Sequence, residues 1–176
     1  MNIICFDSID STNTYAKHHL ATLASGTIIR ARYQTQGRGQ YTRTWQSSPN
    51  ENLLFTFVLQ APLPTDSIET IERIMVQTLR QFLQSKGVSS VHKLPNDIYV
   101  NGKKIAGMLL ETIREGNTVN SIVVGVGFNI NQTTFTALPN ATSLSLVMNQ
   151  TFDIDAMADE FFTLLLQNVH PHFVLK

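Results

Sequence analysis

An Asn-Gly pair at residues 101–102 is the feature of this sequence that most constrains its fold. The pair joins two extended segments within DIYVNGKKIAGMLLETI, residues 97–113. Asn-Gly is the dipeptide best suited to a two-residue hairpin turn, because both turn positions need a positive φ. A connection this short can only join antiparallel neighbours. We therefore expect an antiparallel sheet built around this hairpin.

Hydrophobic patterning predicts the remaining elements. We expect strands over residues 2–9, 26–35, 52–60 and 121–131, and helices over residues 12–24, 64–87 and 153–169. The second helix has a 3.6-residue apolar period, and Asp66 and Glu69 have the spacing of a capping box. Strands and helices do not alternate regularly, which excludes a doubly wound parallel sheet. The pattern predicts an α+β domain with a mixed, mainly antiparallel sheet and helices packed on one face.

Length and charge limit the classes of function. A chain of 176 residues fits one domain, and its 13 basic residues balance its 13 acidic residues. No global charge therefore attracts nucleic acid or an anionic membrane, and any affinity for an anion must be local. Cys5 is the only cysteine, which excludes an internal disulfide and a multi-cysteine metal site. Without an apolar run of membrane-spanning length or a signal peptide, we expect a cytoplasmic protein with no nucleic-acid or membrane partner.

The stretch GRGQYTRTW, residues 37–45, combines flexible backbone with cations and the only tryptophan. Gly37 and Gly39 allow the backbone to approach a ligand closely. Arg38 and Arg43 can present guanidinium groups to a carboxylate or phosphate. Trp45 is either a core anchor or a surface for stacking a base. The alternative for the whole stretch is an exposed polar turn.

A second candidate stretch runs from Lys93 to Glu111. Asn96 and Asp97 place an amide and a carboxylate at the start of a strand, although such a pair also occurs in plain turns. Lys103 and Lys104 are neighbours on a strand and should point to opposite faces, so that one can reach inward. The alternative is that both lysines keep a hairpin soluble. Gly107 indicates close approach of a ligand or another backbone.

Three shorter features complete the candidates. Gly125 and Gly127 in GVGFNIN lie within an expected strand, where they indicate either a bulge or space needed by something else. Ser11 and Thr12 are helix-capping residues that could also offer hydroxyls to a ligand. Gln34 is either solvated or a hydrogen-bonding partner for a ligand. The five histidines show no spacing that suggests a metal site.

Taken in order, STN, YQTQGRGQYTRTW, KLPNDIYVNGKKIAGMLLE and GVGFNIN closely resemble the catalytic domain of biotin–protein ligases. The resemblance extends from about residue 7 to residue 131, with a weaker continuation through residues 153–168. It implies a fold like that of class II aminoacyl-tRNA synthetases. It also implies that the chain makes biotinyl-5′-AMP from biotin and ATP with Mg²⁺, and passes biotin to one lysine of a biotin carboxyl carrier protein domain.

The resemblance assigns roles to individual residues. Lys104 and Arg38 match catalytic positions that stabilise charge on the carboxyl and phosphate groups. Asp97 matches a Mg²⁺ position. The residues implied to bind biotin are Ser11, Thr12, Asn13, Gln34, Gly37, Arg38, Lys104, Gly107, Gly125 and Gly127. Those implied to bind the nucleotide are Arg38, Gln40, Arg43, Trp45, Asn96 and Asn129.

The sequence also departs from the family pattern. Gln40 stands where many members have arginine, so one cation is missing and retention of the adenylate should be weaker. We expect residues 1–176 to form the catalytic domain alone, without the winged-helix segment and with the SH3-like carboxy-terminal β-domain absent or shortened. Without a winged-helix segment, we expect the protein not to bind operator DNA. Members of the family often pair, so a homodimer is also implied.

Three other functions remain open from the sequence. The first is a lipoate–protein ligase or octanoyltransferase of similar fold, which would need an apolar slot instead of hydrogen bonds to a ureido ring. The second is a protein that binds biotin or its adenylate without transferring it. The third is a structural sheet domain whose glycines serve no ligand.

Overall fold

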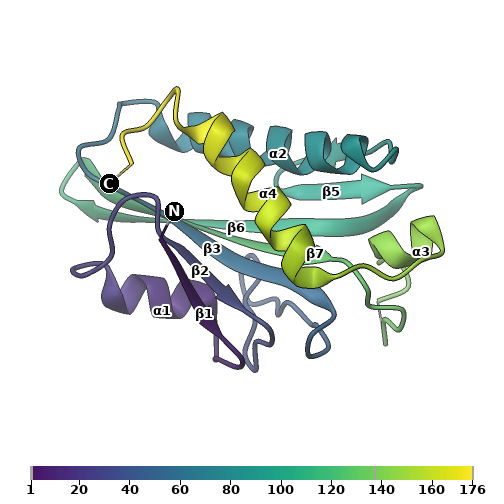
Figure 1. Ribbon diagram of the computed structural model, residues 1–176. Helices are drawn as coiled ribbons and strands as arrows, with labels where there is room; N and C mark the ends of the chain where they lie inside the picture. The colour runs from purple at the N-terminus through teal and green to yellow at the C-terminus, as the bar shows by residue number, and fades with distance from the viewer. Residues whose placement is uncertain (1, 137, 176) are drawn as a thin grey trace.

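The computed structural model describes residues 2–136 and 138–175, and a seven-stranded sheet runs through it (Figure 1). The strand order is β1-β2-β3-β7-β6-β5-β4. The bounds are β1 Ile3–Phe6, β2 Ile28–Ala31, β3 Asn52–Gln60, β4 Val91–Lys93, β5 Asp97–Val100, β6 Lys103–Glu115 and β7 Thr118–Asn129. β1 and β2 pair in parallel, and the other neighbours pair antiparallel. The predicted α+β class with a mixed, mainly antiparallel sheet is confirmed.

The Asn-Gly hairpin forms as predicted between β5 and β6. Asn101 and Gly102 have φ values of 50° and 76°, the positive values that a type I′ turn requires. The register shifts between Ile98 and Tyr99, where one extra residue of β6 enters the pairing with β5. A bulge of this kind reverses which face the following side chains occupy relative to regular alternation. The bulge therefore decides which residues of β6 meet on one face.

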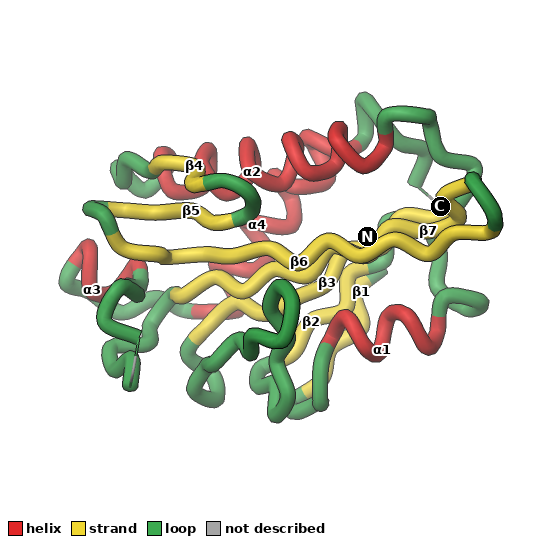
Figure 2. Tube along the Cα trace, turned by 180° about the vertical axis from the view of Figure 1, so that it is seen from behind, coloured by secondary structure: helices red, strands yellow, loops and turns green. Residues whose placement is uncertain are grey.

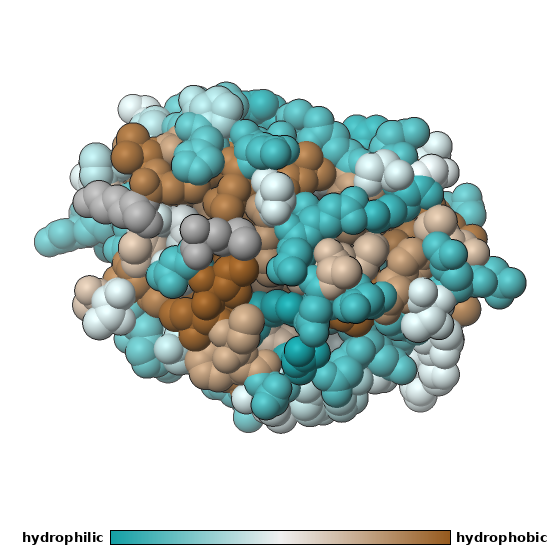
Figure 3. Space-filling model, viewed as in Figure 1, coloured by the Kyte–Doolittle hydropathy of each residue, from teal (hydrophilic) through white to brown (hydrophobic). Residues whose placement is uncertain are grey.

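The two long helices, α2 (Ser67–Ser85) and α4 (Ile154–Val169), cover one face of the sheet (Figure 1). They enclose the main core, in which Phe55, Phe82 and Phe128 pack edge-on against the aromatic rings of α4. The face that these helices present to solvent is mostly polar, and apolar residues reach the surface around the two chain ends (Figure 3). Burial of these aromatic rings supplies much of the stabilising apolar contact.

The short helix α1 (Thr12–His19) is an exception to the prediction that helices pack on one face. It lies on the opposite side of the sheet, where Ala16 packs with Ile29, Val58 and Val123 in a smaller core. Phe57, the chain neighbour of Val58, belongs to the main core, as the alternation of strand side chains requires. Figure 2 shows loops gathered beside α1 on this second face. The second face is therefore not closed by long helices.

Some local predictions need correction. In the described part of the chain, the Asp66 carboxylate caps no backbone N–H of α2; it accepts the Thr70 hydroxyl at 3.0 Å, so the predicted capping box is wrong. β4 and the short helix α3 (Leu144–Met148) carry no strong sequence signal and were not predicted. α1 ends at His19, five residues before the expected end at Ala24.

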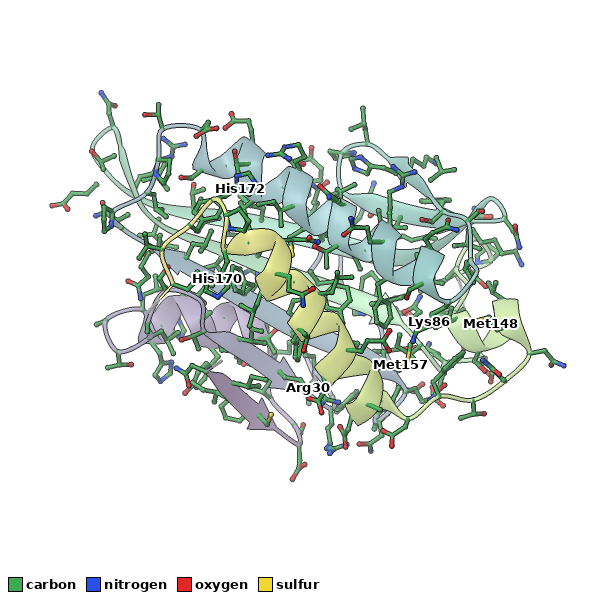
Figure 4. All side chains as sticks on the ribbon, turned by 45° about the horizontal axis from the view of Figure 1, so that its top comes forward. Arg30, Lys86, Met148, Met157, His170 and His172 are labelled. Atoms are coloured by element: carbon green, nitrogen blue, oxygen red, sulfur yellow. The ribbon has the colours of Figure 1, made fainter. Side chains whose placement is uncertain are left out.

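Ion pairs fasten the start of α4 to the sheet. Arg30 of β2 lies against this helix (Figure 4), and its guanidinium lies 2.6 Å from a carboxylate oxygen of Asp155. Arg32 lies 2.9 Å from the other oxygen. Hydrogen bonds from Arg32 and Arg30 hold the pKa of the Asp155 carboxyl below its usual value. Among the described residues, no helix is both long and apolar enough to cross a membrane.

Candidate active site on the α1 face of the sheet

A cavity of about 450 Å³ opens on the α1 face of the sheet. Its walls come from the first turn of α1, the glycine-rich stretch, strands β5, β6 and β7, and the loop after β7. All but one of the predicted site residues line it. Those residues are Ser11, Thr12, Asn13, Gln34, Arg38, Gln40, Arg43, Trp45, Asn96, Asp97, Lys104, Gly107, Gly125, Gly127 and Asn129. The exception is Gly37, which is buried and does not line the cavity.

The glycine-rich stretch forms a small hairpin, which we call the glycine hairpin (residues 37–45). Gly37 accepts a hydrogen bond from the Trp45 N–H at 2.9 Å, and Gly39 donates to the Arg43 carbonyl at 2.9 Å. A Cβ on Gly37 would lie 2.5 Å from the Trp45 carbonyl oxygen, so no larger residue fits there without displacing the backbone. Tyr41 at the tip is 91% exposed. The glycines therefore let the two arms approach closely and hold Arg38 and Trp45 over the sheet.

Gly107 of β6 and Gly127 of β7 form a flat floor under the indole of Trp45. A Cβ on Gly127 would lie 2.2 Å from the ring, and one on Gly107 would lie 3.0 Å from it. At Gly125 a Cβ would lie 2.2 Å from Asn13 Oδ1. Gly125 and Gly127 were expected to leave open space for a ligand ring and its tail. Here the space directly above them is occupied by the side chains of Asn13 and Trp45.

Lys104 enters the cavity because of the β6 bulge. Regular alternation would place Lys104 and Gly107 on opposite faces, since they are three residues apart. With the extra residue in β6, the Lys104 ammonium lies over Gly107, where a Cβ would be 2.9 Å away. Lys103 is exposed, as predicted for the neighbour that meets solvent. Lys104 Nζ lies 2.7 Å from Asp97 Oδ1, a buried oxygen that accepts no well-aligned hydrogen bond from the described residues.

A short chain of polar groups lies where α1 begins. The Thr12 N–H donates to Gln34 Oε1 at 2.8 Å, which fixes the orientation of that amide. Asn13 Nδ2 faces the Leu109 carbonyl at 3.2 Å and a Glu111 carboxylate oxygen at 3.0 Å, which are both acceptors. Asn13 therefore turns its Oδ1 toward the buried hydroxyl of Thr56.

This chain of polar groups has fewer protons than hydrogen-bonding contacts. The gaps run from Gln34 Oε1 to the Thr12 hydroxyl at 2.9 Å, then to the Thr56 hydroxyl at 2.8 Å, then to Asn13 Oδ1 at 2.6 Å. Each hydroxyl carries one proton and both end atoms only accept, so two protons serve three gaps. The chain is therefore rich in acceptors and short of donors. A ligand that brings N–H donors to this place can donate to a hydroxyl or amide oxygen of these polar groups.

Glu111 connects α1 to the glycine hairpin. Its carboxylate lies 2.8 Å from Lys17 Nζ, 3.0 Å from Asn13 Nδ2 and 3.0 Å from Arg38 Nη1. Partial burial by itself would raise the pKa of the Glu111 carboxyl. The hydrogen bonds from Lys17 and Asn13, and the charges of Lys17 and Arg38, outweigh burial and hold the pKa below its usual value. Glu111 is therefore ionised at neutral pH.

The other end of the cavity carries amide groups. Asn129 Nδ2 donates to the Thr142 carbonyl at 2.9 Å, which leaves its Oδ1 buried without a partner among the described residues. Trp45 Nε1 is likewise buried without a hydrogen-bond partner among the described residues. Asn96 Nδ2 donates to the Met108 carbonyl, and the backbone carbonyl of Asn96 accepts the Met108 N–H at 2.9 Å. These contacts fix both amides. Asn129 Oδ1 and Trp45 Nε1 are buried polar atoms without a partner in two residues that line the cavity, and such atoms call for an explanation such as a bound polar group.

Several site residues were missed from the sequence. Phe135, Leu138, Pro139, Asn140 and Ala141 form an unpredicted wall, held beside β6 by a hydrogen bond from the Lys104 N–H to the Asn140 carbonyl at 2.8 Å. Nothing in their sequence marks them. Thr56 had a signal, because it is a hydroxyl within the otherwise apolar run LLFTFVL. Glu111 also had a sequence signal. It follows Gly107 by four residues, and residues four apart on a strand share one face of the sheet.

Comparisons with known proteins agree with the resemblance. The biotin/lipoate A/B protein ligase family matches residues 5–129. A bifunctional ligase/repressor of Bacillus spizizenii is 33% identical over 134 residues, covering 74% of this chain and 41% of that protein. A biotin–[acetyl-CoA-carboxylase] ligase of Paracoccus denitrificans is 31% identical, covering 69% of this chain and 51% of that protein. The chain thus spans about half of these relatives or less.

Solved structures show the same architecture. A biotin protein ligase from Aquifex aeolicus in complex with biotin and ATP has a TM-score of 0.84 at 25% identity, over 96% of this chain and 70% of that one. A biotin protein ligase from Leishmania major in complex with biotin has a TM-score of 0.78 at 24% identity, over 94% of this chain and 73% of that one. The second likeness is evidence of a shared fold alone.

Proposed function

The chain belongs to the biotin/lipoate A/B protein ligase family, and on that premise we propose that it activates biotin with ATP and transfers it to a lysine of a carrier protein. In the first step a carboxylate oxygen of biotin attacks the α-phosphorus of ATP. The bond from that phosphorus to the bridging oxygen breaks, and pyrophosphate leaves. In the second step the amine of the acceptor lysine attacks the acyl carbon, and AMP leaves with the bonding electron pair. The amine loses a proton in forming the amide.

Recognition of the ureido ring is assigned to the polar chain at α1. A ureido ring carries two N–H donors and one carbonyl acceptor. The acceptor-rich polar groups of Thr12, Thr56 and the amide oxygens of Gln34 and Asn13 support this assignment, because their oxygens can accept the N–H groups of such a ring. Ser11 caps α1 and is buried beside this chain, where its hydroxyl can meet the ring carbonyl.

The cations at the cavity wall are assigned to the reacting groups. Two anions, a carboxylate and a triphosphate, must approach each other. One fixed cation about 4 Å from an anion contributes about 4 kcal/mol at an effective dielectric near 20. Lys104 is held over the glycine floor by Asp97 and would stabilise charge on the carboxyl oxygen in both steps. Arg38 and Arg43 on the glycine hairpin would hold the phosphate groups.

The nucleotide is assigned to the amide end of the cavity. Asn129 Oδ1 could accept from an exocyclic amine of the base, while Asn96 and Gln40 line the same space. Trp45, which lines the cavity, would pack against the adenine. Because Gln40 supplies no charge, the adenylate would be held by fewer cations than in relatives that carry arginine there.

Asp97 is the residue proposed to hold Mg²⁺. Mg²⁺ is usually bound through one or two carboxylates together with substrate phosphates. Because Asp97 Oδ1 is ion-paired with Lys104 Nζ at 2.7 Å, the other carboxylate oxygen of Asp97 would bind the ion. The described residues contain no cluster of three acidic, histidine or cysteine ligands that could hold a metal by themselves. When bound, Mg²⁺ would neutralise phosphate charge.

The donor-poor polar chain at α1 is the observation that carries the proposal, because it distinguishes a ureido ring from the dithiolane ring of lipoate, which has no N–H. The test is biotin-dependent exchange of labelled pyrophosphate into ATP with Mg²⁺, run beside the same assay with lipoate. Exchange with biotin alone is expected, followed by labelling of a biotin carrier domain. Exchange with lipoate alone would reverse the choice of substrate, and no exchange with either acid would contradict the proposed activation step.

A further inference from the structure

Glu111 stands directly behind the cavity wall and touches two of its lining residues, Asn13 and Arg38. These residues are far apart in the sequence and belong to different elements, the first turn of α1 and the glycine hairpin. One carboxylate therefore contacts both the ring end and the anion end of the cavity. The side chain of Glu111 is 20% exposed, so the contacts are partly shielded from water.

The contact with Asn13, together with the Leu109 carbonyl at 3.2 Å from the same nitrogen, determines which atom that amide presents to the ring end. A carboxylate can only accept, so the group 3.0 Å from it must be the Asn13 NH₂. The opposite atom, Oδ1, is thereby turned toward Thr56 and ends the polar chain in an acceptor. If Asn13 were reversed, its NH₂ would supply the missing donor itself, and the chain would no longer be short of one. Glu111 provides the charged one of the two acceptors that keep Asn13 in this orientation.

The contact with Arg38 holds the glycine hairpin against β6. Arg38 is the second residue of the hairpin, and its backbone pairs with Thr44 across the two arms. Its guanidinium lies 3.0 Å from Glu111, whereas the tip of the hairpin is exposed. The ion pair is therefore one of the contacts that hold the hairpin over the glycine floor, beside the packing of Trp45 on Gly107 and Gly127.

We propose that Glu111 is a positioning residue for biotin activation, which sets the Asn13 amide and the Arg38 guanidinium in one arrangement and so couples recognition of the ring to recognition of the anions. The inference rests on the proposed function, because the ring and the anions are those of biotin and ATP. Glu111 acts through the two lining residues and does not itself touch the reacting atoms. The lowered pKa of its carboxyl is consistent with this role, since only the ionised form accepts from all its partners.

A purely structural role is the competing explanation, since Glu111 also pairs with Lys17 and so ties α1 to the sheet. Lys17→Met removes that tie and leaves Asn13 and Arg38 their carboxylate, which makes it the matched control. Glu111→Met removes every contact at similar side-chain length. Glu111→Gln keeps one acceptor and serves as the graded variant if the methionine variant folds poorly.

The first measurement is amide hydrogen exchange in the full chain without ligand, read on the hydrogen-bonded N–H groups of Gly39, Arg43 and Trp45. Loss of a charged hydrogen bond should make these amides exchange about tenfold faster in Glu111→Met, and they should stay as in the wild type in Lys17→Met. The second measurement is biotin binding by calorimetry. Affinity should fall by about tenfold or more in Glu111→Met, less in Glu111→Gln, and stay within about threefold in Lys17→Met.

Equal effects of Glu111→Met and Lys17→Met on hairpin exchange would overturn the inference and leave a structural tie. Unchanged exchange in both glutamate variants would overturn it too. Because the exchange measurement uses no ligand, it remains decisive even if the wild type binds no biotin. In that case the proposed function fails, while the coupling of Glu111 to the glycine hairpin is still supported or refuted by itself.

Discussion

Gly107 of β6 and Gly127 of β7 lie directly opposite each other in the sheet, and the indole of Trp45 covers both. Two glycines side by side on adjacent strands cost stability, because neither contributes side-chain packing. Here the cost is offset by the close approach of the largest side chain of the glycine hairpin. The pair therefore gives the cavity a floor made of backbone and aromatic ring.

Gly127→Ala should displace Trp45. The added methyl would lie 2.2 Å from the ring, which is closer than two carbon atoms can approach. Because Trp45 is the only tryptophan, its fluorescence reports this site alone. We expect a red-shifted emission together with a loss of pyrophosphate exchange. In Gly125→Ala the methyl meets Asn13 instead, so biotin binding should weaken while the emission stays that of the wild type. The same emission shift in both variants would contradict this picture.

Lys104→Met should abolish activation of biotin with the fold intact. Loss of one fixed cation worth about 4 kcal/mol corresponds to about a thousandfold drop in the rate of pyrophosphate exchange. The control is Lys103→Met, which removes the same charge from the adjacent, exposed position. Circular dichroism should show native folding in both variants. If the Lys103 variant lost as much activity as the Lys104 variant, the assignment to Lys104 would be wrong.

Thr56→Val should weaken biotin binding without affecting other ligands. The substitution keeps the shape of the fully buried side chain but removes the proton that reaches Asn13 Oδ1 at 2.6 Å. Leaving that acceptor unpaired costs about 1–3 kcal/mol in the free protein. Because Asn13 then loses the contact that fixes its oxygen, biotin affinity measured by calorimetry should fall about tenfold. Thr78→Val is the control, because Thr78 is equally buried but lies in α2 on the other face. That variant should lose stability and keep its affinity, and a parallel loss of affinity would refute the assignment.

The ion pairs of Asp155 should make the fold sensitive to acid. Hydrogen bonds from Arg32 and Arg30 lower the pKa of this carboxyl in the folded state, so its stabilising contribution is present above the usual carboxyl pKa. The contribution is lost as the pH falls through the lowered value. Asp155→Asn should reduce the free energy of unfolding in urea by about 0.5–1 kcal/mol at neutral pH and by less in acid.

Asp7→Asn is the control for this ion pair. Asp7 is 98% exposed and lies 3.6 Å from Arg32, so its loss should leave the unfolding curve unchanged at every pH. A stability difference between the Asp155 variant and the wild type that does not shrink in acid would show that the ion pairs are not its cause.

Much of the site could be predicted from sequence because its motifs are short and local. The glycine hairpin, the KLPND stretch and the paired glycines each lie within a few residues, and the resemblance assigned their roles. Thr56 and Glu111 were missed, although both belong to the same polar network. Thr56 meets Thr12 across 44 residues, and Glu111 meets Arg38 across 73 residues. No local pattern specifies such pairs.

The sequence by itself determined the elements whose signals are periodic or confined to a turn, namely the β5–β6 hairpin, β3, α2 and α4. These signals reflect backbone geometry within a few residues, and so they survive without knowledge of the rest of the chain. The tertiary structure alone decided that α1 packs on the opposite face, that a bulge brings Lys104 over Gly107, and that Asn13 and Trp45 fill the space above Gly125 and Gly127. Periodicity says which residues share a face, but only packing decides what that face meets.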